Sequence, residues 1–191
     1  MKSVLITGPI GSGKSVVSKI LLAMGYPVYD CDSRAKQLID TDSKITEEIE
    51  RTFGCEVFHP DGSIDRKRLA SIVFNDSRKL SRLNNIIHSA VRTDIDRWLC
   101  EQSKSHGIAF VETAIPVTAR LDEMVDKSWI VTAPEVTRRL RVVSYRGMTE
   151  SDFNARNVSQ KKELPDGDCS YIHNDGLRPV LPQIENLLAE L

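Results

Sequence analysis

The chain has 191 residues, of which 40% are hydrophobic and 28% charged, the composition of an ordinary globular protein. Its 26 lysine and arginine residues nearly balance its 27 aspartate and glutamate residues, which argues against a bulk nucleic-acid or membrane-surface binder. No apolar run approaches the length of a membrane span, and a predicted strand starts at once, so we expect a cytoplasmic protein without a signal peptide. Four cysteines lack zinc-site spacing, and we expect free thiols: Cys31, Cys55, Cys100 and Cys169.

Residues 8–15, GPIGSGKS, match the pattern G-x-x-x-x-G-K-[ST] between a strand-like run, KSVLIT, and a helix-like run, SVVSKILLAMG. Glycines at three of these positions allow backbone N–H groups to wrap around phosphate oxygens. Lys14 would contact the terminal phosphates, and the hydroxyl of Ser15 would bind Mg²⁺. The sequence therefore predicts a nucleotide site formed by Gly8, Pro9, Ile10, Gly11, Ser12, Gly13, Lys14, Ser15 and Val16.

Five short apolar runs predict strands: VLIT (4–7), YPVYD (26–30), IAFVETA (108–114), WIVTA (129–133) and SYIH (170–173). Several are almost continuously apolar, which is typical of parallel strands buried on both faces. Because helical segments separate them, the sequence predicts an α/β protein with a doubly wound parallel sheet. Ligands bind such sheets beyond the carboxyl ends of the strands.

The second predicted strand ends in YDCD, which brings Asp30 and Asp32 to the carboxyl edge of the sheet. Two residues apart in an extended chain, they would face the same way. A carboxylate here could accept the proton of an attacking hydroxyl or hold magnesium through water. The alternative is that Asp32 or Ser33 caps the helix SRAKQLI. Glu112, in the third strand, loosely matches a Walker-B acid.

Residues 31–107 are too many for a single crossover helix, so we expect a helical insertion. Its best helix spans 76–100, where six apolar residues recur at helical spacing: Leu80, Leu83, Ile87, Val91, Ile95 and Trp98. Asp65 is expected to cap the helix RKRLASIVF. His88 lies in the long helix, where a lone histidine is more often a packed residue than a catalyst.

Four arginines follow the fourth predicted strand on a predicted helix, APEVTRRLRVVSYRG: Arg138, Arg139, Arg141 and Arg146. As a set they favour a lid over the phosphates, whereas each alone could equally belong to a solvated helix face. Thr149 is expected to cap the next helix. After the last strand, Asn174 and Gly176 form either an ordinary turn or a loop against the nucleotide base.

Taken in order, these segments resemble the dephospho-CoA kinase family over essentially the whole chain. The matching motifs are LITGPIGSGKS, PVYDCD followed by SRAKQL, DGSIDRKRLASIVFNDSRKLSRLNNIIH, VDKSWIVTAPE, GMTESDFNARNVSQ and YIHNDG. The resemblance implies transfer of the γ-phosphoryl group of ATP, with Mg²⁺, to the ribose 3′-hydroxyl of dephospho-CoA, the final step of coenzyme A synthesis.

The resemblance also implies three parts: a phosphate-loop core (1–32 with 105–136 and 168–191), a helical insertion for the CoA moiety (33–104) and a lid (137–167, here called the lid segment). The implied catalytic residues are Asp32 as general base, Lys14, and Arg141. The implied acceptor contacts are Thr7, Asp32, His88 and Arg156. Gln160 also matches the lid pattern, Asn174 and Gly176 match the nucleotide-base loop, and magnesium falls to Ser15, with Asp30 and Glu112 left open as further ligands.

Three positions depart from the family pattern: Ser89 replaces a proline after the histidine, Thr118 stands at an acidic position, and Tyr145 stands at a second lid arginine. The expected partner is dephospho-CoA alone, without nucleic acid or membrane, and the expected state is a monomer or weak homo-oligomer. Three rival interpretations stay open: a phosphate-loop kinase for another small acceptor, a nucleotide-dependent switch, and a degenerate kinase that binds without turnover. No N-K-x-D motif supports the switch.

Overall fold

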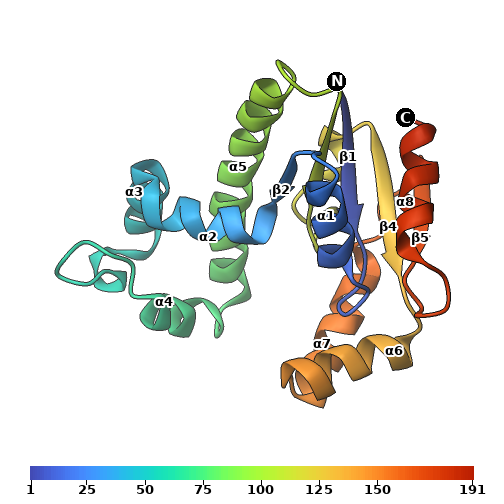
Figure 1. Ribbon diagram of the computed structural model, residues 1–191. Helices are drawn as coiled ribbons and strands as arrows, with labels where there is room; N and C mark the ends of the chain where they lie inside the picture. Colours follow the sequence, from blue (N-terminus) through green and yellow to red (C-terminus); the bar gives the residue numbers. More distant parts are fainter. The chain divides into compact units, whose positions relative to one another are not determined.

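The computed structural model covers residues 1–191, and the chain divides into two units (Figure 1). The sheet unit consists of Met1–Asp30 and Leu99–Leu191, and the helical unit of Cys31–Trp98. The division into core, insertion and lid that the sequence predicts stays a prediction. None of the helices is long and apolar enough to cross a lipid bilayer.

Five strands form a single sheet in the order β2-β3-β1-β4-β5, and all four pairings are parallel. The strands are β1 (Lys2–Thr7), β2 (Val28–Asp30), β3 (Ile108–Glu112), β4 (Lys127–Thr132) and β5 (Cys169–His173). The five predicted strands and the parallel α/β class are thus confirmed. The chain turns from one side of β1 to the other between β3 and β4, so the carboxyl end of β1 is the switch point where such sheets bind ligands.

The helices of the sheet unit are α1 (Lys14–Ala23), α6 (Glu135–Arg139), α7 (Glu150–Ser159) and α8 (Val180–Ala189). Helices α1 and α8 contact each other, and their apolar side chains share one buried cluster with the sheet. That cluster contains Val4, Ile6, Val17, Leu21, Phe110, Trp129, Val131, Ile172 and Ile184. In β1 every residue after Lys2 is buried, as expected for a central strand with both faces covered.

Short segments of other helical types complete the sheet unit. The 3₁₀ turns are Asp122–Met124 and Gln160–Lys162. The single helix predicted after β4 is instead α6 followed by a π-helical turn, Leu140–Ser144. The wide turn occurs where the segment packs directly on the phosphate loop, since a Cβ at Gly11 would lie 2.6 Å from the Arg138 carbonyl oxygen and 2.9 Å from Val142.

The helical unit is formed by α2 (Cys31–Thr41), α3 (Ser43–Phe53), a 3₁₀ turn (Cys55–Val57), α4 (Arg66–Val73) and most of α5 (Ser77–Gln102). Helix α5 confirms the long helix predicted at 76–100. Predicted caps are also confirmed, since Asp65 accepts from the Arg68 N–H at 3.0 Å and Thr149 from the Asp152 N–H at 3.1 Å. The unit has its own core, formed by Ile45, Ile49, Phe53, Val57, Leu69 and Val73.

The geometry expected for the YDCD stretch is wrong. Strand β2 ends at Asp30 and helix α2 begins at Cys31, so Asp32 lies in the first helical turn rather than in an extended chain. The two carboxylates therefore do not share one face of a strand, and neither Asp32 nor Ser33 is the N-cap. A carboxylate in the first turn is favoured by the positive end of the helix dipole.

Candidate active site

The loop between β1 and α1 needs glycine at two positions for steric reasons. Gly8 has a φ of +146°, and a Cβ there would lie 2.2 Å from the carbonyl oxygen of Val131. Gly13 has a φ of +100°, and a Cβ there would lie 2.0 Å from Nδ2 of Asn174. Both distances are shorter than any real contact of a Cβ atom, so the loop backbone is packed against β4 and the segment after β5.

Side chains from the segments that follow β4 and β5 bind the carbonyl oxygens of the loop. Nδ2 of Asn174 donates to the Ser12 carbonyl at 2.9 Å. Nη1 of Arg141 donates to the carbonyls of Gly11 and Ser12 at 3.3 and 3.4 Å, and its Nη2 donates to the Asn174 carbonyl at 2.9 Å. Because the C=O and the following N–H of a trans peptide point in opposite directions, the Ser12 carbonyl held outside leaves the Gly13 N–H pointing inward, whereas the Ser12 N–H donates to the Pro9 carbonyl at 3.1 Å. This arrangement suits an anion.

The phosphate loop also has a cation and buried hydroxyls. Nζ of Lys14 donates to the Gly8 carbonyl at 2.8 Å, so the ammonium lies against the loop. Ser15 follows in the first turn of α1. The buried hydroxyls of Thr7 and Ser12 have no hydrogen-bond partner within the protein, which is uncommon for buried polar groups. The positive end of helix α1, Lys14 and the unpartnered hydroxyls of Thr7 and Ser12 are suited to bind the phosphates of a nucleotide and their magnesium ion.

Two carboxylates lie side by side at the same edge of the sheet. Asp30 ends β2 and Glu112 ends β3, and the parallel register pairs them directly. Glu112 is in turn paired with Ile6 of β1, next to the start of the phosphate loop. Both acidic residues therefore stay candidates for an additional magnesium ligand, and the register does not choose between them. No cluster of three or more His, Cys, Asp or Glu side chains is present that could hold a metal by itself.

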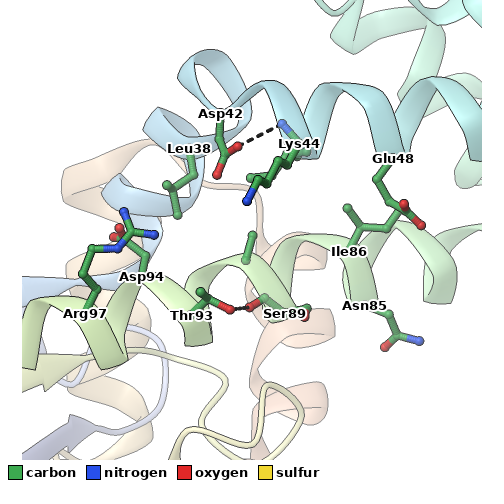
Figure 2. A pocket seen from close by; sticks show the side chains of 12 residues that line it. Leu38, Asp42, Lys44, Glu48, Asn85, Ile86, Ser89, Thr93, Asp94 and Arg97 are labelled. Atoms are coloured by element: carbon green, nitrogen blue, oxygen red, sulfur yellow. Dashed lines mark hydrogen bonds between the residues drawn. The ribbon is translucent and has the colours of Figure 1, made fainter.

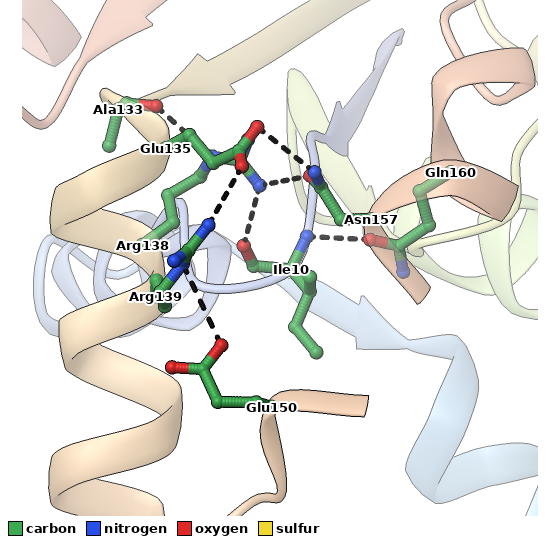
Figure 3. Close-up of polar contacts among 8 residues, drawn as sticks. All are labelled: Ile10, Ala133, Glu135, Arg138, Arg139, Glu150, Asn157 and Gln160. Carbon is green, nitrogen blue, oxygen red and sulfur yellow. Dashed lines mark hydrogen bonds and ion pairs between the residues drawn. The ribbon is translucent and has the colours of Figure 1, made fainter. Parts of the chain in front are cut away.

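The lid segment contacts the phosphate loop through Ile10 (Figure 3). The Ile10 N–H donates to Oε1 of Gln160 at 2.6 Å, and the Ile10 carbonyl accepts from Nη1 of Arg138 at 3.2 Å. Gln160 follows α7 directly, whereas Arg138 lies on α6. Arg139, on the same helix, forms ion pairs with Glu135 and Glu150, at 3.4 and 3.8 Å.

Arg138 is buried, with a side chain only 9% exposed. Its burial lowers the pKa of the guanidinium, and the neighbouring Glu135 carboxylate opposes that effect. The pKa of Glu135 is in turn held below its usual range, first by the hydrogen bond from Asn157 and then by the one from Arg139. Each charge in this cluster thus supports the ionised form of the other.

The remaining predicted residues lie on several other elements. Arg156 is exposed on α7, and Gly176 adopts a φ of +87° in open space after β5. Asp32 is exposed on α2 and His88 half-buried on α5, both in the helical unit. Val16, in the first turn of α1, is 46% exposed. The structure therefore brings together the loop, Arg141, Asn174 and Gln160, and leaves the roles of the others as predictions.

Sequence reasoning missed two polar contacts of the lid segment. Asn157 is buried on α7 and bonds Arg138, and the clue was its spacing: Phe153, Asn157 and Gln160 fall on one helical face. Thr118, which departs from the family's acidic position, donates both its N–H and its hydroxyl to the buried carboxylate of Glu163. The Glu163 carboxylate, near the end of the lid segment, thus lies next to the position where the family has an acidic residue.

Comparison with known proteins identifies the family of this chain. The family model for dephospho-CoA kinase matches residues 3–167. A dephospho-CoA kinase of Porphyromonas gingivalis is 36% identical over 163 residues, 85% of this chain and 79% of that protein. One of Corynebacterium diphtheriae is 31% identical over 190 residues, 96% of this chain and 94% of that protein. A solved structure from Thermus thermophilus, 29% identical, superposes with a TM-score of 0.76 over 100% of this chain and 97% of its own. This chain belongs to the dephospho-CoA kinase family.

Proposed function

We propose that the protein transfers the γ-phosphoryl group of ATP to the ribose 3′-hydroxyl of dephospho-CoA, giving coenzyme A and ADP. The carrying observation is the phosphate loop whose carbonyls are held outward by Arg141 and Asn174. In the reaction, the hydroxyl oxygen attacks the γ-phosphorus, the bond to the β–γ bridging oxygen breaks, and the hydroxyl proton passes to a base. The family assignment supports the choice of acceptor.

The proposed roles follow the chemistry of each group. Asp32 is the general base that accepts the proton of the acceptor hydroxyl. Lys14 and Arg141 neutralise charge that builds on the transferred phosphoryl group and on ADP. Ser15 would hold magnesium, with Asp30 or Glu112 as a further ligand, and the bound ion would offset the charge of the β- and γ-phosphates. His88 and Arg156 are proposed acceptor contacts, and Thr7 completes the acceptor side.

The helical unit supports binding of a bulky acceptor. A cavity of about 660 Å³ lies between α2, α3 and α5, which is the size of many small-molecule sites (Figure 2). Its walls combine apolar side chains with amide, hydroxyl and charged groups: Leu38, Ile86, Asn85, Ser89, Lys44 and Arg97 are among them. Mixed walls of this kind suit a chain that carries amides and methyl groups together, such as the pantetheine arm.

The decisive experiment measures ADP release with MgATP and four acceptors: dephospho-CoA, adenosine, AMP and water. The expected result is turnover with dephospho-CoA alone and a product heavier by one phosphoryl group at the ribose. Asp32→Asn should lower kcat by about 10²–10⁴-fold, the usual contribution of a general base. Asp40→Asn, which removes an exposed carboxylate from the same helix, is the matched control and should retain activity.

Three outcomes would contradict the proposal. Preference for adenosine or AMP would favour the rival kinase for another small acceptor, and ADP release that ignores all acceptors would favour a nucleotide-dependent switch. Binding of MgATP without any turnover would indicate a degenerate kinase. The cytoplasmic location and the monomeric or weakly associated state stay predictions, and sedimentation of the purified protein tests the latter.

A further inference from the structure

In the phosphate loop, Ile10 has both its N–H and its C=O bound by side chains from beyond β4. Gln160 accepts from its N–H and Arg138 donates to its C=O, at 2.6 and 3.2 Å (Figure 3). The first of these partners lies 150 positions away along the chain. The orientation of this peptide is thus set by groups outside the loop itself.

The guanidinium of Arg138, a residue of α6, binds three other parts of the chain. Its Nε donates to the Ala133 carbonyl at 3.1 Å, and its Nη1 donates to Ile10 and also to Oδ1 of Asn157 at 2.8 Å. Asn157 completes the network, because its Nδ2 donates to Oε2 of Glu135 at 3.1 Å. The guanidinium carbon also lies 6.0 Å from the centre of the buried Phe153 ring. The network ties the end of β4, the loop, α6 and α7 together.

The network acts on the part of the loop that would face a phosphate. The peptide between Ile10 and Gly11 is trans, so its N–H points away from its C=O. While Arg138 holds the Ile10 carbonyl, the Gly11 N–H is directed to the opposite side. If the guanidinium moved, the peptide could rotate, because Gly11 has no Cβ to restrain it.

We propose that Arg138 and Asn157 form a clamp that sets the Ile10–Gly11 peptide by the position of α7, so that MgATP affinity depends on Asn157. Arg138 is a positioning residue in this clamp. The proposal rests on the proposed function only in that the loop binds MgATP, and it is independent of the acceptor. Arginine is needed because its planar guanidinium binds the Ala133 carbonyl through Nε while Nη1 binds Ile10 and Asn157, whereas a lysine has a single nitrogen for all three partners.

The test measures MgATP binding by calorimetry without any acceptor, together with thermal unfolding of the free protein. Arg138→Lys and Asn157→Leu should each raise the Kd for MgATP by about tenfold, the effect of losing one charge-assisted hydrogen bond. The Kd of the double variant for MgATP should be no higher than that of the weaker-binding single variant, because both changes break the same hydrogen-bond network. Arg120→Gln removes an exposed arginine paired with Glu123 in the same unit, and its Kd should stay unchanged.

Hydrogen exchange tests the clamp without nucleotide. Asn157→Leu should increase deuterium uptake at residues 8–13 of the free protein, while Arg120→Gln should not. A lowered melting temperature with unchanged Kd and unchanged exchange would show a purely structural role and overturn the proposal. Full MgATP affinity in Arg138→Lys would overturn it as well. If MgATP binding behaves as expected but dephospho-CoA is not phosphorylated, the proposed acceptor is wrong and the proposal about Arg138 and Asn157 is unaffected.

Discussion

The side-chain amide of Asn174 donates a hydrogen bond of 2.9 Å to the carbonyl oxygen of Ser12. The backbone carbonyl of Asn174 accepts from Arg141, which also binds the loop, so these two residues and the loop form a closed ring of contacts. Asn174 is itself fixed by its N–H, which donates to the Thr132 carbonyl at the end of β4 at 2.8 Å. The loop geometry therefore depends on the strand ends beside it.

This contact makes Gly13 sensitive to any side chain. In Gly13→Ala the new Cβ would displace the Asn174 amide, and kcat/KM for ATP should fall by about tenfold or more, as when one preorganised contact is lost. Gly25→Ala is the matched control, because Gly25 also has a positive φ but open space around it. Both variants should lose about 1–2 kcal/mol of unfolding free energy from backbone strain. Equal losses of activity in the two would refute this reasoning.

The ion pair between Arg34 and Asp94 predicts an asymmetric response in the helical unit. Asp94 is almost fully buried and Arg34 is about one-third exposed, at an N–O distance of 2.7 Å. Arg34→Ala should cost about 3 kcal/mol because it removes a close cationic partner from a buried carboxylate, whereas Asp94→Ala should cost less because the arginine can reach water. Urea unfolding measures both.

The pair between Arg66 and Asp40 serves as the control, since both side chains are more than half exposed. Arg66→Ala should change the free energy of unfolding by less than about 1 kcal/mol. If Arg34→Ala were no more harmful than Arg66→Ala, the buried pair would not stabilise the helical unit in the way described.

Asp126 predicts a pH dependence of stability. Its carboxylate accepts from the Ser3 N–H at 2.7 Å and from the Ser3 hydroxyl at 2.9 Å, and these bonds hold its pKa below the usual range. A lowered folded-state pKa adds stability above the unfolded pKa of about 3.9, and this stability disappears as the pH falls through the folded pKa. Asp126→Ala should lose about 1 kcal/mol at pH 7, a small value because the group is exposed.

The measurement compares urea unfolding of the wild type and Asp126→Ala at pH 7, 5 and 3. The difference should persist at pH 5 and narrow at pH 3. Ser3→Ala, which removes the hydroxyl donor, should show a smaller difference with the same trend. A difference that grows toward low pH would contradict the assignment.

Local patterns were sufficient to predict the elements and the phosphate loop. The glycine spacing from Gly8 to Gly13 and the Asp65 and Thr149 caps are decided by neighbours within a few residues, and the structure confirms both caps. The boundary at Cys31 was the exception. A strand pattern and a helix start overlap there, and the sequence alone could not show that the helix begins before Asp32.

Contacts across long stretches of chain could not be predicted in the same way. The bond from Ile10 to Gln160 and the one from Thr118 to Glu163 depend on how the elements pack, which periodicity does not encode. Asn157 is intermediate, because a polar residue on a buried helical face must have a partner, but the pattern does not say which. The packed structure identifies that partner as Arg138.

The π-helical turn Leu140–Ser144 has a consequence for how the segment can vary among relatives. A turn closed by i→i+5 bonds holds one residue more than an α-helical turn, so along the chain it is equivalent to a single inserted residue. The extra residue lies after Arg138 in the chain. Arg138 binds Ile10, which precedes the turn, and Asn157, which lies on α7. A change of one residue in the length of this turn would thus redirect Arg141 while leaving the bond from Arg138 to Ile10 in place.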